Sequence, residues 1–115
     1  MKTVAVKENA TGSGPILASL VVDEAKTYNL ISVSLNLDVA PTTSESFTIT
    51  LDADAGAVYD TLLYTNDLSV GSVTDILWMP DQPILLEGGD AVDVAYANTD
   101  GRLYGLQITA ERRYP

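Results

Sequence analysis

Hydrophobic and polar residues alternate along several stretches of the chain. The alternation is clearest in four segments: Ile31–Leu37, Phe47–Leu51, Val92–Ala97 and Tyr104–Thr109. Because successive side chains of a β-strand point to opposite faces, each of these segments predicts a strand with one apolar and one polar face. Such strands are typical of antiparallel sheets that pack face to face.

Five further segments fit strands bounded by turn-forming residues: Thr3–Val6, Ile16–Val22, Val58–Thr65, Ser72–Trp78 and Ile84–Leu86. Asp100–Gly101 lies between two alternating segments and predicts a hairpin. One helical turn within Asp54–Leu63 is the weaker interpretation there, since Gly56 and several β-branched residues disfavour a helix. We therefore predict a single all-β domain over residues 1–115, an antiparallel β-sandwich of about eight or nine short strands with jelly-roll-like wiring.

The composition is that of one folded domain that does not depend on disulfides. Of the 115 residues, 46% are hydrophobic, which is enough for one core. The chain has no cysteine and no histidine, so Ser-His-Asp and Cys-His catalytic groups and the usual zinc sites are excluded. Neither of the common glycine-rich phosphate-binding motifs is present. We therefore expect no enzymatic activity and no cofactor.

Charge restricts the partners further. Sixteen acidic residues against six basic ones give a net charge of −10. This disfavours binding to nucleic acid and to anionic membranes, which both need clustered lysine and arginine. No stretch approaches the roughly 20 apolar residues that cross a bilayer, and Lys7 ends the first apolar segment before a signal-peptide core forms. We expect a soluble product made in the cytoplasm, whose acidity serves solubility or attracts a basic partner or cations.

Three aspartates are the weak candidates for a metal site: Asp52, Asp54 and Asp60. The run from Asp52 begins like a calcium loop, but an EF-hand needs glutamate at about the twelfth position. That position holds Leu63 or Thr65, depending on which aspartate begins the loop. We therefore expect no metal, with a looser site as the alternative. An acid pair for glycoside hydrolysis needs a cleft, which a small domain rarely forms, so solvated loop acids are the simpler interpretation.

Aromatic residues raise the alternative of carbohydrate binding. Trp78, Tyr59, Tyr64, Tyr96 and Tyr104 are the side chains that could stack on sugar rings. A tryptophan between Leu77 and Met79 is more often part of a core or an interface. Exposed Trp78 and Tyr104 on a shared platform would favour sugar binding, and buried positions would disfavour it.

The second half of the chain resembles small proteins encoded among the virion genes of tailed bacteriophages. The segments that carry the resemblance are Ala57–Tyr64, Val73–Trp78, Leu85–Asp90, Ala95–Arg102 and Tyr104–Leu106, within roughly Phe47 to Glu111. Proteins of this kind include the jelly-roll decoration, or cement, proteins that staple capsid subunits from outside. The resemblance implies a structural role in the virion, with the major capsid protein or another virion protein as partner. We also expect a homo-oligomer, a dimer or trimer.

A cement protein needs chain ends that reach its neighbours. Arg112 and Arg113 place two of the six basic residues after the last alternating segment, and the Lys2–Lys7 segment could pair with a neighbouring chain instead of its own sheet. The predicted interface residues are Thr3, Val4, Val6, Lys7, Arg112, Arg113 and Tyr114. The alternative function is a carbohydrate- or receptor-binding β-sandwich module, such as a tail-tip or fibre domain.

Overall fold

The computed structural model describes residues 2–114 of the chain, with side chains described for residues 3–112. Within these residues the chain forms nine β-strands and one short helical turn. They are β1 (Lys2–Gly12), β2 (Ile16–Val21), β3 (Thr27–Leu37), β4 (Ser46–Asp52), η1 (Ala57–Tyr59), β5 (Thr61–Asp67), β6 (Asp75–Trp78), β7 (Ile84–Glu87), β8 (Ala91–Tyr96) and β9 (Tyr104–Tyr114). No helix in the described part is long and apolar enough to cross a membrane.

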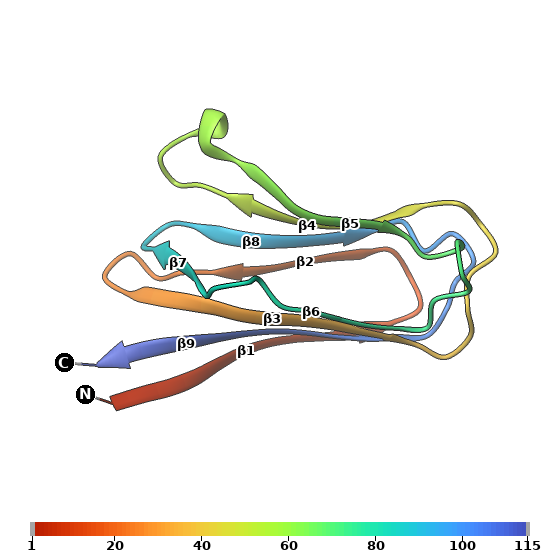
Figure 1. The fold of residues 1–115 in the computed structure, drawn as a ribbon, viewed down its shortest axis with the longest axis horizontal. Helices are drawn as coiled ribbons and strands as arrows, with labels where there is room; N and C mark the ends of the chain where they lie inside the picture. The colour runs from red at the N-terminus through yellow and green to blue at the C-terminus, as the bar shows by residue number, and fades with distance from the viewer. Residues whose placement is uncertain (1, 115) are drawn as a thin grey trace.

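The strands form two antiparallel sheets that lie face to face (Figure 1). One sheet has the order β1-β9-β3-β6, with β7 also paired to β3, and the other has the order β2-β8-β4-β5. Every connection crosses between the sheets except β4–β5 and β6–β7, which is the wiring of a jelly roll. The predicted antiparallel β-sandwich is therefore confirmed. Three strands, β1, β3 and β9, have 11 residues each, longer than the short strands expected.

The turn at Asp100–Gly101 does not form the predicted hairpin. It joins β8 to β9, and these strands belong to different sheets. Asn98 and Gly101 both have positive φ angles, of 50° and 66°, and the Gly101 N–H donates to the Asn98 carbonyl over 2.9 Å. The sequence pattern identified a tight turn correctly, but turn-forming residues do not determine whether the next strand pairs with the last one.

A β-bulge changes the inward face of β3. The register with β9 shifts between Leu30 and Ser32, which leaves Ile31 as the extra residue. Leu30 is therefore fully buried and Ile31 only half-buried, although the alternation placed Ile31 on the apolar face. The bulge allows the apolar residues on both sides of it to face the core.

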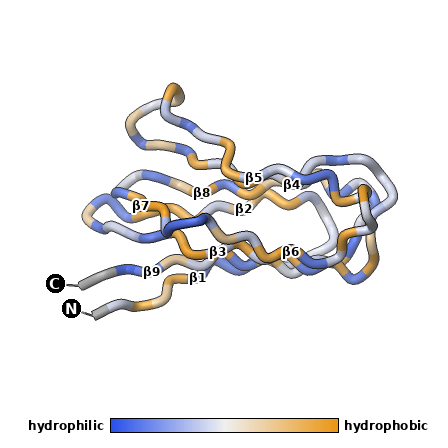
Figure 2. The backbone as a smooth tube through the Cα atoms, viewed as in Figure 1, coloured by the Kyte–Doolittle hydropathy of each residue, from blue (hydrophilic) through white to orange (hydrophobic). Residues whose placement is uncertain are grey.

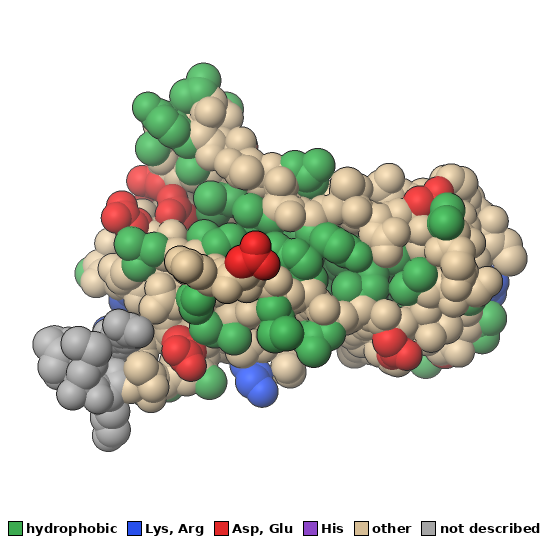
Figure 3. All heavy atoms as spheres, in the orientation of Figure 1, with side chains coloured by type: hydrophobic (Ala, Val, Ile, Leu, Met, Phe, Trp, Pro, Cys, Tyr) green, Lys and Arg blue, Asp and Glu red, His purple; other side chains and the backbone are tan. Residues whose placement is uncertain are grey.

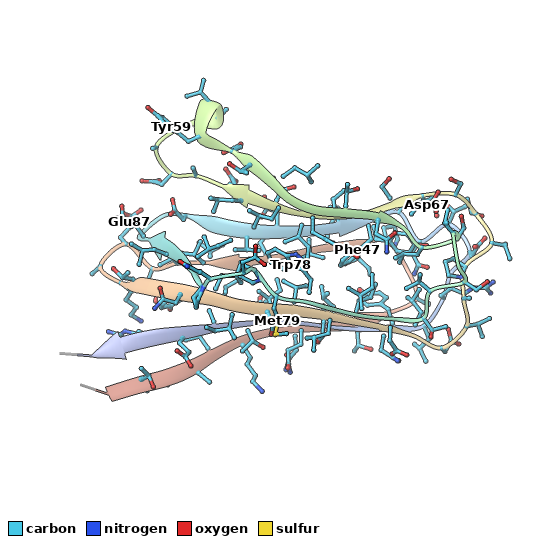
Figure 4. The ribbon with its side chains drawn as sticks, viewed as in Figure 1. Phe47, Tyr59, Asp67, Trp78, Met79 and Glu87 are labelled. Carbon is cyan, nitrogen blue, oxygen red and sulfur yellow. The ribbon has the colours of Figure 1, made fainter. Side chains whose placement is uncertain are left out.

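A row of aromatic rings runs through the core from one sheet to the other. Phe47 is fully buried, and its ring lies edge-on to Tyr64 and Tyr96, with centroids 6.4 and 6.5 Å away. Tyr64 on β5 lies 6.2 Å from Trp78 on β6 and so connects the two sheets. Phe47 and Trp78 both lie in the space between the sheets (Figure 4). These contacts fix the two sheets against each other.

The connection between β4 and β5 projects from the sandwich together with the first two residues of β5, and we call residues 53–62 the arm (Figure 1). Its helical turn, η1, covers Ala57–Tyr59, so the weaker interpretation of one helical turn within Asp54–Leu63 is confirmed. The strand expected over Val58–Thr65 begins only at Thr61. The outer end of the arm is hydrophobic (Figure 2). The arm leaves the sandwich at the same end as the two chain termini, on the side of the other sheet (Figure 1).

Candidate interaction surface

Pairing of β1 with β9 brings the two halves of the predicted interface together. The strands are antiparallel over their whole length, and Val4 lies opposite Arg112 while Lys7 lies opposite Thr109. Residues from the two ends of the sequence therefore lie side by side on neighbouring strands, and we call this region the β1–β9 end. Because side chains alternate along a strand, Val4 and Arg112 lie on the same face as the core residues Val6 and Ala110, whereas Lys7 lies on the outer face. Lys2–Lys7 pairs with β9 of its own chain, so the expectation that it pairs with a neighbour instead of its own sheet is wrong. The other edge of β1 pairs with no strand among residues 2–114.

The predicted interface side chains differ in exposure. Thr3 and Lys7 are exposed, and 42% of Val4 is exposed. Val6 and Arg112 are half-buried, and Val6 packs against the core. Arg113 and Tyr114 belong to β9, but their side chains lie outside the described residues.

The open edge of β1 differs from the other sheet edges in the described part of the chain. A strand edge offers a row of unpaired N–H and C=O groups, and proteins usually protect it with short strands, prolines or bulges. On one sheet, β6 and β7 are four residues each and are separated by Pro80 and Pro83. On the other, β2 has six residues and follows Pro15, and β5 carries a bulge at Leu63.

β1 has none of these interruptions. It runs for 11 residues without a proline and without a register shift against β9. Lys7 and Glu8 at its centre limit unselective pairing but do not break the strand. The edge of β1 is therefore the one most suited to contact another protein.

The weak metal candidates do not converge on one point. Asp60 accepts a hydrogen bond from the Ala53 N–H at 2.9 Å, and the Asp54 N–H donates to Asp90 at 2.9 Å. Within the described residues, no three acidic side chains are grouped so that they could hold a metal ion. Asp52 and Asp60 do lie close together, and the negative charge of Asp60 raises the pKa of Asp52 above its ordinary value. Desolvation and the negative charge of Asp93 raise this pKa further, by smaller amounts.

We expect Asp52→Asn to make the protein more stable at pH 7, with a higher Tm, because the substitution removes the repulsion between Asp52 and Asp60. The raised pKa means that the folded state binds the Asp52 proton more tightly than the unfolded state does. Protonated Asp52 therefore stabilises the folded state at low pH, and this stabilisation is lost as the pH rises through the pKa that Asp52 has in the folded state. Melting curves at pH 7 and pH 3 measure the effect, with Asp81→Asn in the β6–β7 loop as the control. A variant no more stable than the wild type at pH 7 would contradict this account of Asp52.

Two shallow hollows lie on the outer faces of the sheets, and neither is lined by an aromatic side chain. One, of about 330 Å³, lies on the β1–β9–β3 sheet beside Asn9 and Gln107. The other, of about 390 Å³, lies on the opposite sheet around Asp93, whose carboxylate accepts a hydrogen bond from Ser19 at 2.6 Å. Asp93 is the one carboxylate among the residues of this second hollow, so the hollow offers no acid pair.

The aromatic side chains are distributed over the molecule. Trp78 and Tyr104 are half-buried against the core, on β6 and at the start of β9. Tyr59, which is 62% exposed, lies on the arm (Figure 4). These three residues therefore share no platform of the kind that stacks on sugar rings.

The opposite end of the sandwich is tied together by hydrogen bonds between loops. The Asp100 carboxylate accepts hydrogen bonds from the N–H groups of Thr42 and Thr43 at 2.7 and 2.9 Å and from the Thr43 hydroxyl at 2.6 Å. The Thr43 hydrogen bonds, then that of Thr42, lower the pKa of Asp100 to about 2. Glu45 binds both the N–H and the hydroxyl of Thr99. The loops at this end are therefore held together by hydrogen bonds from Asp100 and Glu45.

Sequence reasoning missed the arm as a surface feature. Val58 is 88% exposed and Leu62 is 56% exposed, although both were assigned to a strand of the sandwich. The sequence does contain a sign that this segment is exposed. Asp52, Asp54 and Asp60 lie beside its apolar residues, and a strand that faces the core rarely has several charged neighbours.

Comparison with known proteins returned no matching family model and no curated protein of significant similarity.

Proposed function

We propose that this chain is a non-catalytic structural protein of a tailed-phage virion, namely a capsid decoration protein that binds and stabilises the shell through protein–protein contacts. The observation that carries this proposal is the long, uninterrupted edge of β1, which lies beside the C-terminal strand. An edge of this kind can add a strand to a sheet or accept one from a neighbour.

The rest of the molecule supports a role in assembly. The jelly-roll body is held by a continuous core and by the hydrogen-bonded loops at one end. A decoration protein needs such a rigid body, and it needs no nucleophile or cofactor. The proposed partners are the major capsid protein or another virion protein and further copies of this chain, as a dimer or trimer. The proposed location is the virion, after synthesis in the host cytoplasm.

The alternative, a carbohydrate- or receptor-binding module, has less support. Trp78 and Tyr104 are half-buried and lie apart from the arm residue Tyr59, so these three side chains offer no common stacking surface.

Purified particles test the proposal directly. Particles are banded by density from cells that carry the gene, and the copies of this chain per particle are counted by quantitative mass spectrometry. We expect wild-type protein in the particles and about tenfold fewer copies of Val4→Glu, because the substitution replaces apolar contact surface with a carboxylate that must lose its water, at a cost of at least about 1.4 kcal/mol.

Val21→Glu is the matched control. Val21 is 59% exposed on β2, an edge strand of the other sheet, so the substitution makes the same change of charge on a strand that does not belong to the β1–β9 sheet. It should leave the copy number unchanged. Absence of the wild-type chain from the particles, or equal incorporation of Val4→Glu, would refute the proposal.

A further inference from the structure

We propose that the arm of one copy docks on the β1–β9 end of a second copy, so that the protein associates head to tail. The inference rests on the proposed function in one respect, namely that the β1–β9 end is a contact surface. It adds the partner of that surface, a second copy of this chain, and the segment of the partner that binds there.

The arm presents apolar side chains to solvent. Val58 is 88% exposed, Tyr59 62% and Leu62 56%, and all three come from one short segment. Figure 3 shows hydrophobic side chains at the outer end of the arm and acidic ones where it meets the body. Contiguous exposed apolar surface on a projecting element marks a site of protein–protein contact.

The arm is also preformed. Asp90 accepts a hydrogen bond from the Asp54 N–H, and Asp60 closes the base of the arm through the Ala53 N–H, both at 2.9 Å. The Asp54 side chain fills the space that a side chain at Gly89 would need, and Gly89 has a φ of 89°. Binding through the arm therefore costs little ordering of the chain, which favours association.

The distribution of charge along the chain indicates which surface of a second copy the arm contacts. Residues 27–101 contain twelve acidic and no basic residues, and the arm belongs to this region. The remainder of the chain contains six basic and four acidic residues. An apolar tip surrounded by aspartates needs a partner with positive charge, because like charges across an interface are repelled.

The β1–β9 end supplies that charge. Four of the six basic residues lie on these two strands, Lys2 and Lys7 on β1 and Arg112 and Arg113 on β9, against the acidic residues Glu8 and Glu111. A fifth, Lys26, is bound to Asp23 of its own chain at 2.7 Å. Val4, which is 42% exposed beside Arg112, adds apolar surface for the tip of the arm.

The contact forms between copies and not within one. The arm continues the β2-β8-β4-β5 sheet and points away from the sheet that contains β1 and β9 (Figure 1). Each copy therefore carries one arm and one receiving surface on different sides. Such heterologous contacts build a closed ring when the rotation between copies closes, and a filament when it does not.

Sedimentation velocity over a wide range of protein concentrations tests this inference. We expect wild-type protein to associate, and Val58→Ser/Tyr59→Ser to weaken association by about tenfold or more, as loss of central apolar contacts does. The control is Val70→Ser/Leu103→Ser, which removes exposed apolar surface, 69% and 57% exposed, from the opposite end of the molecule. Thermal midpoints of both variants should match that of the wild type, since these side chains are exposed.

Mixing two variants distinguishes head-to-tail association from any other kind. Val4→Glu/Lys7→Glu keeps the arm and loses the receiving surface, whereas Val58→Ser/Tyr59→Ser keeps the receiving surface and loses the arm. Each should associate about tenfold or more weakly alone than the wild type does, and the mixture should form a heterodimer through the one remaining contact. Monomeric wild-type protein, unimpaired association of the arm variant, or no heterodimer would overturn the inference. Wild-type protein found in particles would still support the proposed function in each of these cases.

Discussion

Replacing Phe47 with alanine is expected to lower the free energy of unfolding by about 4 kcal/mol. Phe47 is fully buried, and it links Tyr64 and Tyr96 in the aromatic row between the sheets. Alanine removes the buried ring and its two edge-on contacts and leaves a cavity that strands on both sides hold open. Urea denaturation followed by tryptophan fluorescence measures the change.

Phe47→Leu is the matched control, because leucine keeps most of the buried volume. We expect it to cost about 1 kcal/mol, since it retains apolar volume but loses the aromatic contacts. Similar losses for alanine and leucine would show that the ring contacts, and not the filled volume, stabilise this part of the core.

Asn98→Ala should destabilise the protein by about 3 kcal/mol. Asn98 is 3% exposed, and its amide group donates to the carbonyls of Ser13, Gly14 and Arg102 over 3.3, 2.9 and 3.0 Å. Its side-chain oxygen accepts the Arg102 N–H at 3.0 Å. Alanine leaves these backbone groups without their partner and must also adopt the φ of 50° that asparagine tolerates.

Asn98→Gly separates the two causes. Glycine adopts a positive φ without strain but makes none of the side-chain hydrogen bonds, so it should be about 1 kcal/mol more stable than Asn98→Ala. Thermal and urea unfolding of both variants give the difference. If both variants unfolded like the wild type, Asn98 would not be what holds the β8–β9 turn to the loop after β1.

The alternation of apolar and polar residues was sufficient to predict the sandwich. The buried residues of β4 (Phe47 and Ile49) and of β9 (Leu106, Ile108 and Ala110) follow it, because each of these strands has one face on the core. The pattern could not reveal the bulge at Ile31, since an extra residue changes which residues face inward without changing the composition. Turn residues likewise located the turn at Asp100–Gly101 but not the sheet to which the next strand belongs.

The interaction surface was predictable only in its parts. Basic residues near both chain ends suggested contacts there, and the structure pairs the two ends as neighbouring strands. This proximity depends on the order of strands in the sheet, which no local pattern encodes. The arm was missed because its apolar residues, such as Val58, satisfy the composition of a strand as well as that of an exposed tip.

The two ends of the sandwich differ in a way that fits a role in assembly. At one end, Asp100 and Glu45 bind neighbouring loops and Asn98 is buried, so side chains hold the loops together there. At the other end, the arm and the β1–β9 end expose apolar side chains and a strand edge. A protein that contacts neighbours through one end needs the opposite end to keep the sheets in register.

Electron cryomicroscopy of purified particles is the most direct test of the central claim that this chain is a structural component of a virion. We predict jelly-roll density for this chain on the outer surface of the capsid, at symmetry-related positions, with the β1–β9 end against a neighbouring protein. A capsid surface that bears no density for this chain, with the chain recovered only in the fraction that does not band with particles, would contradict the account.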